Sequence, residues 1–196
     1  MILPTTFAGR VALRLLTAFG WQLLYRAPSM SKAVITFYPH TSNWDFVVGI
    51  LARTVMALQV RFIAKESLFV WPFGALFRRL GGIAVKRGQR ANQVAALARE
   101  FDKHETFYLL FAPEGTRRKT DSWRSGFYRL ALALELPVGL AFIDYAKREI
   151  GVLEYLSLSG DETLDLARIS AAYLGRSGKY PGQQSPIAFI AANDKP

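Results

Sequence analysis

Short apolar runs alternate with longer stretches of helical periodicity along most of this chain. The runs predict strands at 33–38, 60–64, 82–86, 106–112, 138–144 and 150–156. The periodic stretches predict helices at 44–58, 67–80 (interrupted by Pro72), 90–103, 127–136 and 162–174. Strands that alternate with helices are typical of α/β proteins, in which helices join neighbouring parallel strands. The pattern therefore predicts a mixed, largely parallel sheet flanked by helices.

The N-terminal stretch from Phe7 to Tyr25 has the pattern of one amphipathic helix. The residues expected on its apolar face are Val11, Leu15, Leu16, Phe19 and Leu23, opposite Arg10, Arg14 and Thr17 with Trp21. An apolar stripe opposite cations is typical of a helix lying at a membrane interface. The aromatic segment 67–80, which ends in Arg78 and Arg79, could insert at the same depth. Both patterns also fit ordinary core helices, so membrane contact rests on the two together.

The chain has 196 residues, enough for one substantial core, and we expect a single domain. Within it we expect a membrane-interface helix in 1–26, a motif-bearing core at 34–145 and a C-terminal tail of loop at 175–196. No apolar stretch approaches the roughly 20 residues of a spanning helix, and no signal peptide is recognisable at the start. We therefore expect a peripheral protein on the cytoplasmic face of the inner membrane.

The net charge and the composition limit the classes of binding partner that we expect. The net charge is +10, and residues 1–130 hold nineteen Lys and Arg against seven Asp and Glu. Such a field attracts polyanions: nucleic acid, anionic lipid or an acidic carrier protein. No nucleic-acid-binding signature is present, so we expect no nucleic-acid partner. With no cysteine and only two histidines, we also expect no metal site and no cofactor.

Two polar segments stand out in this apolar sequence, one from His40 to Asp45 and one from Pro113 to Arg117. Each follows a predicted buried strand. Ligands of open α/β sheets bind at the carboxyl ends of the strands, so we expect both segments to face one crevice. This convergence favours an enzyme.

The first segment offers a base with a carboxylate five residues later. If His40 ends its strand and Asp45 lies in the next helical turn, the carboxylate can orient the imidazole as a general base. No nucleophilic serine motif is present, so the attacking hydroxyl would come from the substrate. An equally good interpretation is a helix-capping box at 42–45 with His40 as a loop residue. In the second segment, Gly115 and Arg117 suit an anion site, although a solvated loop has the same composition.

Together these residues resemble the glycerophospholipid acyltransferase superfamily, to which the lysophosphatidic acid acyltransferases belong. The His-x4-Asp block is present at 40–45 and the Pro-Glu-Gly-Thr-Arg block at 113–117. Between them, Lys65, Pro72 and the Gly81–Arg87 stretch resemble the second block, and Arg124 replaces the lysine of a later signature. The fourth block, Leu136–Leu140, lacks its second proline, which leaves the acceptor open.

The resemblance implies an O-acyltransferase in which His40 deprotonates an acceptor hydroxyl and Asp45 orients His40. The acyl donor would be acyl-CoA or acyl carrier protein, and the acceptor a lysolipid, most simply lysophosphatidate or a related lysophospholipid. The residues implied at the acceptor phosphate are Lys65, Arg87, Glu114, Gly115, Thr116 and Arg117. An anionic Glu114 cannot bind phosphate directly, so we expect it to position Arg117 or a backbone amide.

Two alternatives remain at this point. The acceptor could be a lipid without phosphoglycerol. The chain could also be a non-catalytic, basic, peripheral membrane-binding protein of the same fold.

Overall fold

The computed structural model describes residues 6–85 and 90–189, and one seven-stranded sheet organises them in the order β1-β7-β6-β2-β5-β3-β4. The strands are β1 (Gln22–Tyr25), β2 (Lys32–Tyr38), β3 (Val60–Lys65), β4 (Gly82–Val85), β5 (Phe107–Phe111), β6 (Val138–Asp144) and β7 (Glu149–Leu156). The β6–β7 pair is antiparallel, and the other five pairings are parallel. The predicted mixed, largely parallel sheet is confirmed.

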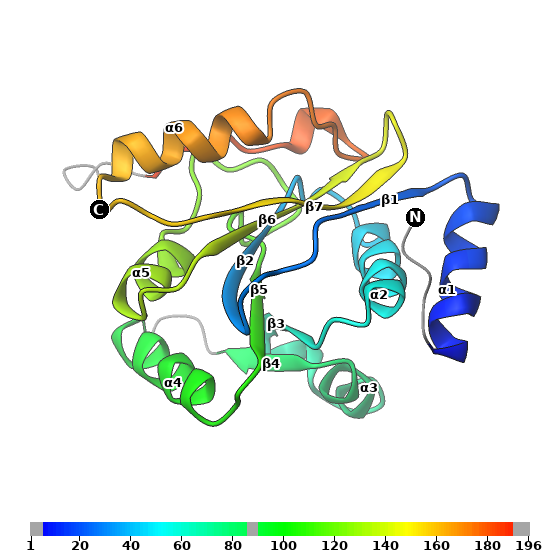
Figure 1. Ribbon diagram of the computed structural model, residues 1–196, viewed down its shortest axis with the longest axis horizontal. Helices are drawn as coiled ribbons and strands as arrows, with labels where there is room; N and C mark the ends of the chain where they lie inside the picture. Colours follow the sequence, from blue (N-terminus) through cyan, green and yellow to red (C-terminus); the bar gives the residue numbers. More distant parts are fainter. Residues whose placement is uncertain (1–5, 86–89, 190–196) are drawn as a thin grey trace.

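Helices cover both faces of the sheet, so the molecule has three layers (Figure 1). The helices are α1 (Phe7–Ala18), α2 (Trp44–Met56), α3 (Gly74–Arg79), α4 (Arg90–Asp102), α5 (Gly126–Ala133) and α6 (Glu162–Ala172), with short 3₁₀ turns η1 (Glu66–Leu68) and η2 (Pro181–Gln183). One core lies between the sheet and α1 and α2, and the other lies between the sheet and α4, α5 and α6.

The central strand β2 shows how the sequence builds both cores. Val34 belongs to the core under α4 and α5, and Ile35 belongs to the core under α1 and α2. Both side chains are almost completely buried. Successive side chains of a strand point to opposite faces, so a strand with helices on both sides must be apolar throughout. This accounts for the nearly continuous apolar run that predicted the strand, in which the buried Thr36 hydroxyl is paired with the hydroxyl of Tyr173.

The predicted N-terminal helix is wrong beyond Ala18. Gly20 has a left-handed φ of 76°, and the amides of Phe19 and Trp21 donate to carbonyls of the last helical turn. A glycine in this conformation commonly ends a helix. The chain then turns into β1, which pairs with β7 at the edge of the sheet. The glycine was visible in the sequence, but the apolar residues after it continued the helical pattern.

The face of α1 also differs from the prediction. Ala12 and Leu16 pack into the core, whereas Val11, Leu15 and Phe19 are at least 39% exposed. The expected apolar stripe is therefore divided between the core and the surface. Phe7, which is 74% exposed, extends the exposed part by one turn. Among the described residues, no helix combines the length and apolar content needed to cross a bilayer.

Candidate active site

The sheet topology brings the polar segments together. Strands β6, β2, β5 and β3 are neighbours and run parallel, so their carboxyl ends lie at one edge. His40 follows β2, Glu114 follows β5, and Lys65 ends β3. The register pairs Thr36 with Phe111, which places the two polar segments side by side. The predicted convergence at the strand ends is found in the structure.

His40 and Asp45 form a hydrogen-bonded pair. His40 Nδ1 lies 3.1 Å from Asp45 Oδ2. Asp45 stands in the first turn of α2 and is 1% exposed, whereas the His40 side chain is 18% exposed. A carboxylate only accepts hydrogen bonds, so Nδ1 donates to it and the neutral ring keeps Nε2 as an acceptor. The pair thus has the geometry of a base with its orienting carboxylate.

The same carboxylate organises the start of α2. Asp45 Oδ2 also accepts the amides of Thr41 and Ser42, at 2.9 and 2.8 Å, and Ser42 Oγ accepts the amide of Trp44 at 3.2 Å. Only the carboxylate half of the predicted capping box forms, because Ser42 Oγ takes the amide of Trp44 rather than that of Asp45, and this half is compatible with the contact to His40. Asp45 closes the turn that positions His40, and it contacts His40 directly.

Glu114 lies beneath the site and holds two distant segments. It is 1% exposed, and its two oxygens accept the amides of His40 at 2.6 Å and of Ser185 at 2.9 Å. Burial raises the pKa of Glu114, and the two backbone donors act against that shift. Glu114 therefore holds backbone amides as expected of it, but they belong to the candidate base His40 and to Ser185 rather than to the loop of Arg117.

The loop after Glu114 presents polar groups to solvent. Gly115 has a φ of 67°, and its amide donates to the carbonyl of Ala112 at 2.9 Å. A side chain at this position would collide with the Arg124 guanidinium, so glycine lets Arg124 cross the loop. Thr116 is partly buried and Arg117 is exposed. The exposed guanidinium of Arg117 can thus approach an anion at this loop.

Two further cations, Lys65 and Arg87, were predicted at the acceptor phosphate. Lys65 is exposed at the end of β3, two strands from His40 in the sheet. Arg87 lies outside the described residues, just beyond the end of β4. Among the described residues, no group of three or more His, Cys, Asp or Glu side chains could hold a metal ion.

The C-terminal residues contribute more than the predicted loop. Residues 177–189, the closing segment, cross both polar segments. The amide of Tyr180 donates to Thr41 Oγ1 at 3.2 Å, and the Ser185 amide reaches Glu114. A side chain at Gly178 would lie 2.6 Å from Thr41 Oγ1, so the segment passes in close contact. Its Gly, Pro, Ser and Gln content gave no signal of this role, because such composition suits any loop.

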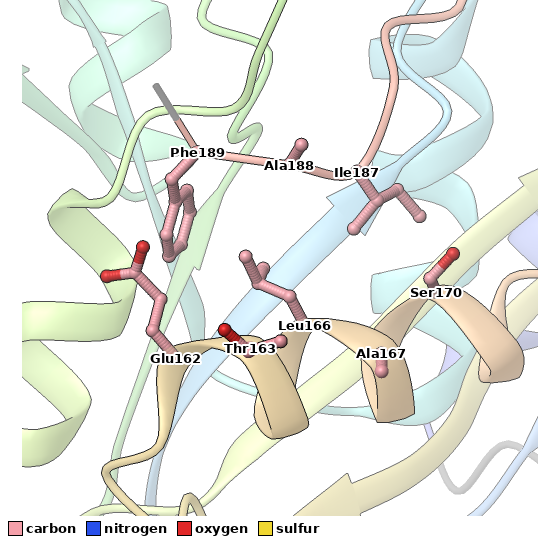
Figure 2. Close-up of a pocket in the computed structure, with 8 residues that line it drawn as sticks. All are labelled: Glu162, Thr163, Leu166, Ala167, Ser170, Ile187, Ala188 and Phe189. Atoms are coloured by element: carbon pink, nitrogen blue, oxygen red, sulfur yellow. The ribbon is translucent and has the colours of Figure 1, made fainter. Parts of the chain in front are cut away.

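One hollow of about 480 Å³ lies away from these residues, between α6 and the end of the closing segment (Figure 2). Leu166 and Phe189 face into it, and Glu162 stands at one end. None of the predicted site residues lines it. The candidate site is therefore the polar edge of the sheet rather than this hollow.

Comparison with known proteins agrees with this geometry. The Acyltransferase family model matches residues 23–140, so the chain belongs to the Acyltransferase family. The resemblance to the glycerophospholipid acyltransferase superfamily is thereby confirmed. No curated protein sequence matches the chain. The crystal structure of PlsC from Thermotoga maritima, a 1-acyl-sn-glycerophosphate (LPA) acyltransferase, is similar in fold. Its TM-score is 0.57 at 17% identity, over 84% of this chain and 74% of that one.

Proposed function

We propose that this acyltransferase moves a fatty acyl group from acyl-CoA or acyl carrier protein to the hydroxyl of a lysolipid. The favoured acceptor is lysophosphatidate or a related lysophospholipid. The observation that carries the proposal is the His40–Asp45 pair, whose Nδ1–Oδ2 distance is 3.1 Å, beside the glycine–arginine loop at the same sheet edge.

In the proposed reaction His40 is the general base. Nε2 takes the proton of the acceptor hydroxyl while that oxygen attacks the thioester carbonyl. The tetrahedral intermediate then collapses, the carbon–sulfur bond breaks, and the imidazolium returns the proton to the leaving thiolate. Asp45 keeps Nδ1 engaged throughout, which stabilises the charged ring that forms between the two transfers. The products are an ester and a free thiol, and no cofactor is consumed.

The acceptor phosphate is assigned to the loop after Glu114. Gly115, Thr116 and Arg117 would contact it, and Lys65 and Arg87 are the further cations implied for it. Arginine matches the geometry of phosphate oxygens, and the hydroxyl of Thr116 can add a donor. Glu114 would not contact the phosphate, because its two oxygens already accept the amides of His40 and Ser185.

We further propose that the protein works as a peripheral protein at the cytoplasmic face of the inner membrane. The support is a group of exposed apolar residues on three neighbouring elements. They are Phe7, Val11, Leu15 and Phe19 on and after α1, Trp44 and Val47 on α2, and Leu68, Val70, Trp71, Phe73 and Leu76 around η1 and α3. Trp71 is 91% exposed, and Trp44 is adjacent in sequence to Asp45. Such a surface would hold the site at the level of a lipid acceptor.

The decisive measurement is thiol release from acyl-CoA and acyl carrier protein by purified protein on anionic vesicles, with a panel of lysolipid acceptors. We expect acceptor-dependent release that falls at least ~10²-fold in His40→Ala, because general-base catalysis is lost. His104→Ala is the matched control, since His104 is the only other histidine of the chain and should leave the rate unchanged. Vesicle binding without release, equal in wild type and His40→Ala, would instead favour the non-catalytic membrane protein.

A further inference from the structure

The two oxygens of Asp45 have different partners. Oδ2 takes His40 Nδ1 and the amides of Thr41 and Ser42, as described above. Oδ1 accepts a hydrogen bond of 2.8 Å from the hydroxyl of Tyr145. This residue lies 100 positions further along the chain, outside every motif that the sequence analysis singled out. The side of the carboxylate that does not face His40 is therefore held by a separate element.

The fold fixes Tyr145 at this position. It follows β6, which lies next to β2 and runs parallel to it, with Phe142 paired to Tyr38. Tyr145 and His40 therefore leave the sheet at the same edge. The Tyr145 ring packs edge-on against Trp21, with centroids 5.0 Å apart and planes at 84°. Its backbone amide donates to the carbonyl of Ser177 at 2.8 Å. The ring and backbone are thus both restrained, and the hydroxyl has a defined direction.

The chemistry of this contact allows one role for the hydroxyl. Facing a carboxylate, a phenol can only donate. Burial and the bond to Asp45 raise the pKa of Tyr145, so the phenol keeps its proton across the working range. The donor is consequently permanent, and it pins the rotation of the Asp45 carboxylate about its Cβ–Cγ bond.

We infer that Tyr145 is a positioning residue of the His40–Asp45 pair, an inference that rests on the proposed function. Tyr145 acts on the reaction through Asp45 and touches no reacting atom. With Oδ1 held, Oδ2 stays in line with Nδ1, and Nε2 keeps its direction towards the acceptor hydroxyl. A hydrogen bond to the carboxylate that holds a working imidazole commonly helps to set the orientation of the imidazole ring.

The test is Tyr145→Phe, which keeps the ring against Trp21 and removes only the hydroxyl. We expect kcat for acceptor-dependent thiol release to fall about tenfold while KM for donor and acceptor stays unchanged, because the misplacement affects the base rather than binding. Unchanged kcat in Tyr145→Phe, in a wild type whose release depends on His40, would overturn the inference and leave the proposed function standing.

Tyr128→Phe is the matched control. The Tyr128 hydroxyl also donates to a buried carboxylate, Asp165, at 2.9 Å, but it joins α5 to α6 in the other core. Removing it should cost a similar amount of stability without changing kcat. If both variants lowered kcat in proportion to their loss of stability, the effect of Tyr145 would be structural and the inference would be wrong.

A second readout does not depend on turnover. The chain has two histidines, so the imidazole nitrogen NMR spectrum reports only His40 and His104. Tyr145→Phe should shift the His40 Nδ1 signal and leave that of His104 unchanged, while Tyr128→Phe should shift neither. If wild type releases no thiol with any acceptor, the proposed function fails, and this spectrum alone decides the inference. An unshifted His40 signal in Tyr145→Phe would then overturn it.

Discussion

At the scale of single residues, the two carboxylates of the candidate site do different work. Asp45 contacts the imidazole and the turn around it, whereas Glu114 accepts the amides of His40 and Ser185 and a hydrogen bond from the Ser185 side chain. The cations Arg117 and Arg124 are both exposed at the loop, where Arg124 crosses Gly115. Negative charge therefore supports the site from inside, and positive charge faces outward, where an anionic acceptor would arrive.

Arg117→Ala should raise KM for a phosphorylated acceptor about 10- to 100-fold, because net hydrogen bonds to charged groups contribute about 1.5–3 kcal/mol. The value of kcat should change little. The measurement is thiol release at varied lysophosphatidate, compared with an acceptor that lacks phosphate. Arg118→Ala is the matched control, since it removes the neighbouring exposed cation. An Arg117→Ala variant with unaltered KM for lysophosphatidate would remove Arg117 from the phosphate site.

Most of the candidate site could be predicted from the sequence, because its parts are local. His40 and Asp45 are five residues apart, and each polar segment directly follows a strand. Tyr145 follows β6 in the same way, so the rule about strand ends could have found it. Ser185 could not be found, since its contact with Glu114 spans 71 residues and Ser185 belongs to no motif.

At the scale of elements, the strands and helices with strong periodicity were predicted to within a few residues. The error was in the N-terminal stretch, where the apolar residues of a strand follow those of a helix closely enough to look like one helix. Leu16 and Leu23 belong to one apparent helical stripe, yet Leu16 lies in the core under α1 and Leu23 lies in β1. Periodicity records which residues are apolar and does not record what covers them. Deleting residues 1–26 would remove β1 together with α1. A loss of vesicle binding could then not be attributed to α1.

A better test replaces the exposed residues of α1 alone. Phe7→Ser, Val11→Ser and Leu15→Ser combined should weaken sedimentation with anionic vesicles at least about tenfold, because apolar area buried in the lipid interface is lost. Urea unfolding of the same variant measures any loss of stability, because Val11 and Leu15 are only 39% and 43% exposed. Leu174→Ser, at a position 84% exposed after α6, is the control. Equal vesicle binding by the triple variant and wild type would exclude α1 from the membrane contact.

At the scale of the whole molecule, Glu114 connects three parts of the chain. It lies after β5, it holds the amide of the residue that follows β2, and it holds the closing segment. Tyr38 adds to the same junction by donating its hydroxyl hydrogen to the Ser185 carbonyl at 3.1 Å. The site is therefore coupled to the packing of the complete sheet and not to one loop.

Glu114→Gln should lower the free energy of unfolding by about 1–3 kcal/mol, because the amide group can accept only one of the two buried backbone hydrogens. Urea unfolding followed by tryptophan fluorescence measures this change. Glu105→Gln removes an exposed carboxylate and should leave the unfolding midpoint unchanged. A midpoint for Glu114→Gln equal to that of wild type would mean that the two amides find other acceptors.

The contact between Glu114 and the closing segment also bears on how the protein is made. His40 and Glu114 leave the ribosome well before Ser185, which is 71 residues beyond Glu114. Until then one oxygen of Glu114 lacks its native donor, and Thr41 lacks the amide of Tyr180. A growing chain thus carries the histidine and both carboxylates in an incomplete setting. Assembly of the site therefore has to wait until Ser185 has left the ribosome.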